Sequence, residues 1–274
     1  MRPAEVLARA TRYLDAHDVE DSRRTAEILM ESVLHTDRAG LYSRAEGLTA
    51  AEARAFGRAL CRRCAGAPVQ HLTGEQPFRS ITLRVRAGVF IPRPETEIVV
   101  DAALDAIEGV PSPVVADVGT GTGAIALSLK AERPDARVFA TDVSVEAVEL
   151  ARENAQALGL DVTVLHGDAF GPLPSETRAS LVVSNPPYLT REEYSTLPRE
   201  VRADPERALV GGTELHARLA VESPSHLAAG GWLVAEIGST QGNEVAELLR
   251  ARFDDVEILP DLAGRDRVVR GRLR

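Results

Sequence analysis

The N-terminal part of the chain places apolar residues at helical spacing. A period of about 3.6 residues predicts three helices, over Pro3–Ala16, Ser22–His35 and Thr49–Cys64. Thr49, followed three residues later by Glu52, forms a capping-box pattern at the start of the third helix. Helices of this length can pack into a small bundle, so we expect a helical domain over residues 1–74.

After residue 74 the pattern changes to the alternation of a strand. Ile81–Val85 alternates between apolar and polar residues, and Val89–Ile91 is predicted to be its hairpin partner. This hairpin, within residues 75–93, would link the helical domain to the rest of the chain. A helix is expected next, from Glu95 to Glu108.

From Val114 onward, strands and helices alternate with short connections. Strands are predicted near residues 114–118, 136–141, 162–166, 180–184, 232–237, 255–259 and 266–270. Helices are predicted near residues 123–133, 144–158, 213–229 and 241–252. The alternation indicates an α/β domain over residues 94–274 with a doubly wound, mainly parallel seven-stranded sheet, which binds ligands beyond the carboxyl ends of its strands. The last two strands should form an antiparallel hairpin, and residues 189–212 should be a long functional loop.

A stiff polar loop follows the fourth predicted strand of this domain. Residues 184–188 read Ser-Asn-Pro-Pro-Tyr. Pro186 and Pro187 fix their φ angles and carry no N–H donor, and Asn185 is held extended because a proline follows it. The Asn185 side-chain oxygen and the Pro186 carbonyl can each accept an N–H from one planar NH2 group, on which Tyr188 can stack. The loop is typical of a site that holds an amide or an exocyclic amine for methyl transfer; alternatively, it is only a proline-rich strand exit.

A glycine-rich turn joins the first of these strands to its helix, through Gly119, Thr120, Gly121, Thr122 and Gly123. Its spacing, with Asp142 and Val143 ending the next strand, fits a ligand that contains an adenosine ribose. Both NAD and S-adenosylmethionine contain one. Asp117 favours S-adenosylmethionine, because its carboxylate would attract the ammonium group of the methionine part and would repel a pyrophosphate.

The third predicted strand of this domain also ends in an acidic residue. Asp168 is expected to accept a hydrogen bond from the adenine amino group, and Ala169 and Phe170 follow it, with Phe170 as the nearest aromatic face. The acidic and amide residues thus occur in the order of successive strand ends. This order is more specific than any single motif.

Composition narrows the class of partner. The chain has 274 residues, of which 44% are hydrophobic, and a formal charge of −9. Residues 1–75 contain 11 basic and 11 acidic side chains, whereas the rest contains 21 basic and 30 acidic ones. Binding of nucleic acid needs a basic track that neutralises phosphates, so the charge favours a protein substrate and no stable nucleic-acid partner.

Other sequence features bear on location and metal binding. No apolar run approaches the length of a membrane span, and the N-terminus lacks the apolar core of a signal peptide, so a cytoplasmic protein without a membrane partner is expected. Cys61 and Cys64 have no second Cys/His pair to complete a zinc site. We expect a reduced cysteine pair and no metal.

Taken together, the motifs resemble those of class I S-adenosylmethionine-dependent methyltransferases of the Asn-Pro-Pro-Tyr type. Three further stretches resemble the glutamine methyltransferases of peptide chain release factors: Pro68–Phe78, Ile91–Glu97 and Asp261–Arg267. The resemblance covers nearly the whole chain and is weakest over the first 60 residues. Related enzymes that act on a ribosomal protein usually have a serine-containing sequence at residues 93–97, which favours release factors here. The chain departs from the family pattern at Asp204-Pro205, where Glu-Pro is usual, and at Ala169, where Trp is frequent.

The resemblance implies methyl transfer from S-adenosylmethionine to the side-chain amide nitrogen of the glutamine in the Gly-Gly-Gln motif of release factors, with S-adenosylhomocysteine as the product. It assigns the acceptor site to Asn185–Tyr188. We further expect the helical domain to dock the substrate and the protein to be a monomer. Arg93, Glu95 and Glu97 either orient the glutamine or simply begin a helix.

Three rival functions use only some of these features. An adenine methyltransferase acting on DNA or RNA would use the same tetrapeptide, but it predicts a basic face. An NAD-dependent oxidoreductase would use the glycine turn and would not need Asn-Pro-Pro-Tyr. A non-catalytic adaptor would need only the helical bundle.

Overall fold

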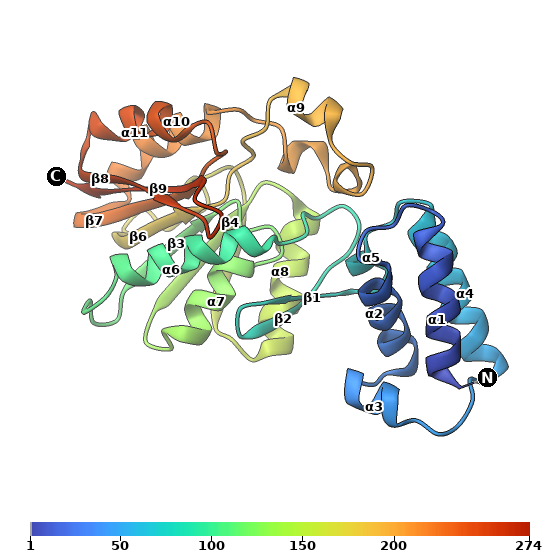
Figure 1. Ribbon diagram of the computed structural model, residues 1–274. Coiled ribbons are helices and arrows are strands. Elements are labelled where there is room, and N and C mark those ends of the chain that lie inside the picture. The colour runs from blue at the N-terminus through green and yellow to red at the C-terminus, as the bar shows by residue number, and fades with distance from the viewer. Residues whose placement is uncertain (1) are drawn as a thin grey trace. The chain divides into compact units, whose positions relative to one another are not determined.

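The computed structural model describes residues 2–274, which divide into two compact units (Figure 1). The first unit comprises the chain up to Glu75 together with Pro198–Ala203, and the second comprises Gln76–Leu197 and Asp204–Arg274. The hairpin predicted as a linker therefore belongs to the second unit. No helix within residues 2–274 is long and apolar enough to cross a membrane.

The first unit is a bundle of helices around its own core. The predicted helices are present as α1 (Pro3–Asp15), α2 (Ser22–Leu34) and α4 (Ala50–Cys64), and two short helices that the periodicity missed complete the bundle, α3 (Arg38–Ser43) and α5 (Val69–Thr73). Leu14, Leu29 and Met30 are fully buried between them. The capping box is confirmed: Thr49 Oγ1 accepts from Glu52 N at 3.2 Å, and Thr49 N donates to Glu52 Oε2 at 2.7 Å.

Part of the predicted loop 189–212 also belongs to this first unit. Glu200 accepts a 2.6 Å hydrogen bond from Arg63 on α4. The loop as a whole is less irregular than expected, because α9 (Arg191–Thr196) and two single-turn helices, η2 (Val201–Ala203) and η3 (Glu206–Ala208), lie within it. The segment thus connects the acceptor tetrapeptide to residues that pack with the N-terminal helices.

The second unit contains the predicted seven-stranded sheet. Its strands are β3 (Val114–Val118), β4 (Arg137–Asp142), β5 (Val162–His166), β6 (Ala179–Ser184), β7 (Leu227–Glu236), β8 (Phe253–Pro260) and β9 (Asp266–Leu273), in the spatial order β5-β4-β3-β6-β7-β9-β8. The first five are parallel, while β9 runs antiparallel to both β7 and β8. The α/β fold and the antiparallel hairpin at the sheet edge are therefore confirmed.

Helices cover both faces of this sheet (Figure 1). One core packs α6 (Glu97–Ala106), α7 (Ala124–Glu132) and α8 (Val145–Leu158) against the sheet, and another packs α10 (Glu214–Glu222) and α11 (Gly242–Arg250). Within β3, Val115 contributes to the first core and Ala116 to the second, as the two-residue period of a strand requires. Burial on both faces explains the nearly continuous apolar runs of the parallel strands.

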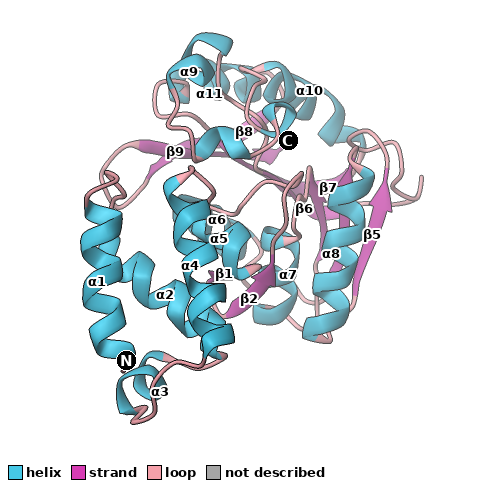
Figure 2. Ribbon diagram, turned by 90° about the vertical axis from the view of Figure 1, so that its right-hand side faces the viewer, coloured by secondary structure: helices cyan, strands magenta, loops and turns pink. Residues whose placement is uncertain are grey.

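The linking hairpin differs from the prediction. Its strands are β1 (Glu75–Phe78) and β2 (Ile81–Arg84) (Figure 2), so the partner precedes the predicted strand. Residues 89–91 form no strand. Arg79 adopts a left-handed conformation, with φ 51°, which permits the tight turn. Val89 instead packs against Ala147 and Leu150 on α8.

Two other predicted boundaries shift. The helix predicted over residues 213–229 ends at Glu222, where a single 3-10 turn that contains Pro224 stops it, and β7 begins at Leu227, earlier than expected. The helix predicted from Glu95 begins with the turn η1 (Pro94–Thr96), ahead of α6.

Candidate active site

A cleft opens at the carboxyl ends of β3, β4 and β6. Most of the residues predicted for cofactor and acceptor binding line it: Gly119, Thr120, Gly121, Thr122, Asp142, Val143, Asp168, Ala169, Asn185 and Pro187. The other predicted residues, Asp117, Gly123, Phe170, Pro186 and Tyr188, do not belong to its lining. The structure therefore brings most of the glycine turn, two strand-end acids and two residues of the tetrapeptide, Asn185 and Pro187, to one site.

The glycine turn is held by the backbone of β4. The N–H groups of Gly119 and Thr120 both donate to the carbonyl of Thr141, at 2.9 and 3.0 Å. Gly121 has φ 57°, and an added Cβ there would meet no atom within 4 Å, so the backbone faces open space. At Gly123, in contrast, a Cβ would come within 2.8 Å of Leu127, so this glycine permits close packing of α7. A ligand can approach the first glycines and not the last.

Asp142 ends β4 and is fixed by backbone donors. Its Oδ2 accepts from Gly121 N at 2.9 Å, and its Oδ1 accepts from Ser144 N at 2.8 Å. Each carboxylate oxygen can accept a second hydrogen bond. Because Asp142 also lines the cleft, these remaining lone pairs suit a pair of ribose hydroxyls.

Asp117 lies beneath the turn and is fully buried. Its Oδ2 accepts from Thr120 Oγ1 at 2.6 Å and from Ala126 N at 3.2 Å, whereas its Oδ1 has no partner among the described residues. Burial raises the pKa of this carboxyl to about 7, against the opposing effect of the two hydrogen bonds and with a further rise from the charge of Asp142. An unpartnered buried carboxylate oxygen suits a cationic group, although Asp117 itself does not reach the lining of the cleft.

The third strand end differs from its prediction. Asp168 lines the cleft, but both of its oxygens accept from Arg218, at 3.0 and 3.1 Å. Phe170 offers no aromatic face to the cleft: it is 3% exposed and stacks on His226, with the ring centroids 4.7 Å apart. Ala169, at φ 43°, turns the chain so that the next side chain enters the core. The prediction of an aromatic adenine face at Phe170 is therefore corrected.

The tetrapeptide leaves β6 beside β7. Asn185 lines the cleft, and its Nδ2 donates to Thr96 Oγ1 at 3.0 Å. The Tyr188 hydroxyl donates to Glu236 Oε1 at 3.2 Å, and the Tyr188 carbonyl accepts from Gln241 at 2.9 Å. The hydroxyl of Tyr188 is thus engaged inside the protein, and burial raises its pKa.

Two residues of this network were not predicted as site residues. Thr96 Oγ1 donates to Glu236 Oε2 at 2.7 Å, and both side chains are buried. Burial raises the pKa of Glu236 to about 7; the bond from Thr96, the nearby Arg267 and the bond from Tyr188 oppose the rise, and Glu95 adds to it. A signal for Glu236 was available in the sequence: it ends an apolar strand with an acid, as Asp142 does in β4 and Asp117 nearly does in β3.

Arg93 and Glu97, which lie close to Thr96 in the sequence, have partners other than Asn185. Arg93 pairs with Asp204, whose second oxygen accepts from Ile91 N at 3.1 Å. Glu97 accepts from Arg79 N at 3.1 Å and so supports the hairpin turn. Within the run 93–97, only Thr96 is hydrogen-bonded to Asn185.

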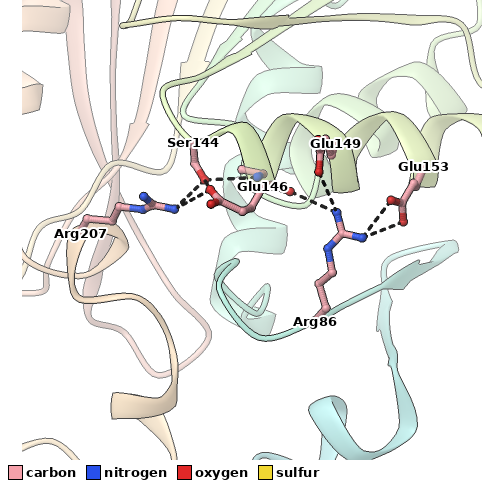
Figure 3. Close-up of polar contacts among 7 residues, drawn as sticks. Arg86, Ser144, Glu146, Glu149, Glu153 and Arg207 are labelled. Atoms are coloured by element: carbon pink, nitrogen blue, oxygen red, sulfur yellow. Dashed lines mark hydrogen bonds and ion pairs between the residues drawn. The ribbon is translucent and has the colours of Figure 1, made fainter.

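A further contact ties the loop after the tetrapeptide to α8. Arg207 lines the cleft and donates to Ser144 Oγ at 2.6 Å and to Glu146 Oε2 at 3.1 Å (Figure 3). Ser144 also caps α8, accepting from Ala147 N at 3.3 Å. The loop is thereby joined to the residues that follow Asp142.

Two family models match successive parts of the chain. Residues 5–74 match the model of the PrmC N-terminal domain, and residues 81–264 match that of the methyltransferase small domain. The release factor glutamine methyltransferase of Moorella thermoacetica is 43% identical over 271 residues, which are 96% of this chain and 95% of the relative. That of Deinococcus radiodurans is 41% identical over 277 residues, 99% of each chain.

Solved structures share the fold at low identity. The 16S rRNA methyltransferase of T. thermophilus, in complex with AdoMet and guanosine, aligns with a TM-score of 0.56 and 21% identity, over 73% of this chain and 50% of that one. The hMettl16 catalytic domain, in complex with an RNA hairpin, aligns with a TM-score of 0.57 and 14% identity, over 78% and 81%. At this identity the likeness is one of fold.

Proposed function

The chain belongs to the release factor glutamine methyltransferase family, and from this premise we propose that it transfers a methyl group from S-adenosylmethionine to the side-chain amide nitrogen of a release factor glutamine. One observation carries the proposal. Asn185 lines the same cleft as the glycine turn and Asp142, and its NH2 group is occupied by Thr96, which leaves its oxygen for an acceptor. An acceptor amide and a methyl donor can therefore meet in one cleft.

The cofactor would lie along the glycine turn. Asp142 would accept the ribose hydroxyls, the open backbone at Gly121 would allow close approach, and the buried charge of Asp117 would favour the ammonium end. When bound, S-adenosylmethionine supplies an electrophilic methyl group on a sulfonium. Asp168 lines the cleft and would accept the adenine amino group on a lone pair that its bonds to Arg218 leave free.

The part of the cleft around Asn185 and Pro186 would hold the glutamine amide by both of its N–H groups. Asn185 Oδ1 would accept one, and the Pro186 carbonyl, which has no hydrogen-bond partner among the described residues, would accept the other. Two such bonds favour a lone pair localised on nitrogen and hold it in one direction. Alignment of reacting groups contributes roughly 7–11 kcal/mol in the most favourable cases. An amide is a poor nucleophile, so this alignment would supply much of the rate.

The acceptor would be the glutamine of a Gly-Gly-Gln loop, whose flanking glycines let the side chain enter a narrow site. The N-terminal helices, together with residues 198–203, would dock the body of the release factor. Binding energy from such remote contacts helps to position the reacting groups, so a short peptide should react much more slowly than the intact factor. Because release factors act on the ribosome, we place the reaction in the cytoplasm.

The test is mass spectrometry of intact release factors incubated with this protein and isotope-labelled S-adenosylmethionine. One labelled methyl group is expected on the glutamine of the Gly-Gly-Gln loop, and none after that glutamine is replaced. RNA and DNA are offered in parallel reactions. Label in nucleic acid with unmodified release factor would establish the rival adenine-methylating activity and overturn the proposal.

A further inference from the structure

A continuous chain of hydrogen bonds leads from Asn185 into the interior of the second unit. Asn185 Nδ2 donates to Thr96 Oγ1 at 3.0 Å, and Thr96 Oγ1 donates to Glu236 Oε2 at 2.7 Å. Glu236 receives the Tyr188 hydroxyl on its other oxygen at 3.2 Å. Thr96 and Glu236 are 3% and 2% exposed, so both side chains are largely shielded from bulk water, although Thr96 belongs to the lining of the cleft.

The chemistry of the three groups fixes the direction of every bond. Because burial raises the pKa of Glu236 to about 7, its carboxylate is ionised above that pH; it then only accepts hydrogen bonds, and the Thr96 hydroxyl must give its single proton to Glu236. The Thr96 oxygen can then act only as an acceptor toward Asn185. This requires the NH2 end of the Asn185 amide to face Thr96, and the oxygen end is left for the cleft.

The opposite orientation of the amide is penalised. If the side-chain amide of Asn185 were turned by 180°, its oxygen would face the Thr96 oxygen, which is also an acceptor. Its NH2 group would then point into the cleft, where the N–H of the substrate glutamine needs an acceptor. A buried polar group that loses its partner costs about 1–3 kcal/mol. Without the Thr96 hydroxyl both orientations would be accessible, and only one of them accepts an N–H from a glutamine.

The sheet explains why these residues meet. Ser184 of β6 is in register with Ala235 of β7, so the next residues, Asn185 and Glu236, leave neighbouring strand ends together. Thr96 closes the turn η1 and packs between them as the start of α6 follows. The arrangement depends on segments that are far apart in sequence and is not a local feature of the tetrapeptide.

We propose that Thr96 and Glu236 are positioning residues for methyl transfer, which hold the Asn185 amide with its oxygen toward the acceptor. The inference rests on the proposed function, because it assumes an acceptor that donates an N–H to Asn185. Thr96 sets the direction of the amide, and Glu236 sets the direction of the Thr96 hydroxyl. Neither residue needs to touch the substrate.

The test compares Thr96→Val with Thr96→Ser in the full-length protein. Thr96→Val keeps the shape of the side chain but removes the hydroxyl, and we expect kcat for release factor to fall about tenfold to a hundredfold. The Kd for S-adenosylmethionine should change less than about threefold. Thr96→Ser restores the hydroxyl and should recover kcat to within a few fold of the unaltered protein. Thr96→Ala should resemble Thr96→Val, which covers the case in which the valine variant fails to fold.

The control is Thr177→Val, which changes another buried threonine of the same unit that lies outside the cleft. It should leave kcat unchanged. Full activity in Thr96→Val, or an equal loss in Thr96→Ser and Thr96→Val, would overturn the inference, since a packing role does not depend on the hydroxyl in this way.

A second readout separates this inference from the proposed function. The side-chain NH2 resonances of Asn185 should exchange slowly with solvent in the unaltered protein and in Thr96→Ser, and quickly in Thr96→Val. Equal exchange rates in the unaltered protein, Thr96→Ser and Thr96→Val would contradict the proposal that Thr96 holds the Asn185 amide. If the unaltered protein does not label release factor, the proposed function fails while the exchange measurement still decides the orientation of Asn185.

Discussion

The two halves of the cleft are built in different ways. In the cofactor half, Asp142 is held by backbone N–H groups of Ser144, two residues away, and of Gly121, 21 residues away. In the acceptor half, Asn185 is held by Thr96, 89 residues away, and Thr96 by Glu236, 140 residues away. The first half is made by turns at strand ends, and the second by side chains that meet only in the folded sheet.

This difference predicts which quantity each half controls. Backbone-anchored groups such as Asp142 present fixed acceptors to a ligand in any state of the reaction, so their loss should appear in binding. The chain from Asn185 to Glu236 orients one amide toward the atom that reacts, so its loss should appear in kcat. Substitutions in each half can separate the two effects.

The largest effect is expected for Asn185→Ala. Loss of the acceptor oxygen removes the alignment of the glutamine nitrogen, and we expect kcat to fall at least about a hundredfold, with the Kd for S-adenosylmethionine within a few fold of normal. Radiolabel transfer to release factor and calorimetric titration of the cofactor measure the two quantities. Substantial activity in this variant would remove the assignment of Asn185.

A buried asparagine outside the cleft, Asn154, gives the matched stability control. Asn154 bonds the backbone of Arg84 in both directions, at 2.8 and 3.1 Å, and donates to the Thr122 carbonyl at 2.9 Å. Asn154→Ala should lower the free energy of unfolding by several kcal/mol, at about 1 kcal/mol for each bond and more for partners left unpaired. Thermal unfolding should show a lower midpoint for Asn154→Ala than for Asn185→Ala.

Asp142→Ala should produce the converse pattern. The change removes the ribose acceptor and also frees the N–H groups of Gly121 and Ser144, so the turn loses its anchor. We expect the Kd for S-adenosylmethionine to rise about tenfold to a hundredfold, since charge-assisted bonds are lost. With saturating cofactor, kcat should recover largely. A variant with normal Kd and low kcat would contradict the division into two halves.

The same difference explains what the sequence revealed. The glycine turn and Asp142 lie at the ends of successive strands, so their spacing along the chain was enough to predict a cofactor site. The seven strands and the helices between them were likewise visible as periods of two and of about 3.6 residues. For these seven strands and the helices predicted between them, only the ends moved, for example where Pro224 stops α10 early.

Long-range partners were not visible in this way. Asn185 and Glu236 lie close together because β7 is adjacent to β6 and the register of the two strands aligns their carboxyl ends. A local sequence pattern does not predict which strands are adjacent or how they are aligned. Phe170 was expected at the cleft, but the left-handed backbone of Ala169 directs it to the core. The hairpin partner was placed after β2 because Val89 is apolar, whereas Val89 packs on α8.

A smaller effect is expected from pH in the cofactor half. Burial raises the pKa of Asp117 from 3.8 to about 7, so the negative charge is lost as pH falls through 7. Affinity for the cationic cofactor should therefore fall as pH is lowered from 8 to 6, by up to about tenfold per unit below the pKa. Asp117→Asn should bind more weakly at pH 8 and show little change with pH. Calorimetry at several pH values measures both proteins.

The sign for stability is opposite. A raised pKa means that the folded protein disfavours the charged carboxylate, so this contribution to stability is complete below about pH 4 and is lost as pH rises through 7. Relative to the unaltered protein, Asp117→Asn should therefore gain stability as pH rises from 4 to 7. Denaturant unfolding of the two proteins across this range checks the sign. A constant difference would show that Asp117 does not titrate there.

The smallest effect is expected where the loop meets the cofactor half. Arg207 bonds Ser144 and Glu146 at the start of α8, while Arg86 bonds Glu153 further along the same helix, at 2.9 Å (Figure 3). Exposed pairs of this kind contribute about 0–1 kcal/mol each. Because only Arg207 lines the cleft, Arg207→Ala should raise the Kd for S-adenosylmethionine about two- to fivefold, and Arg86→Ala should leave it unchanged. Added salt should reduce the difference between the two variants, since both pairs are screened. Equal Kd values for the two variants at low salt would show that the bonds from Arg207 to Ser144 and Glu146 do not contribute to cofactor binding.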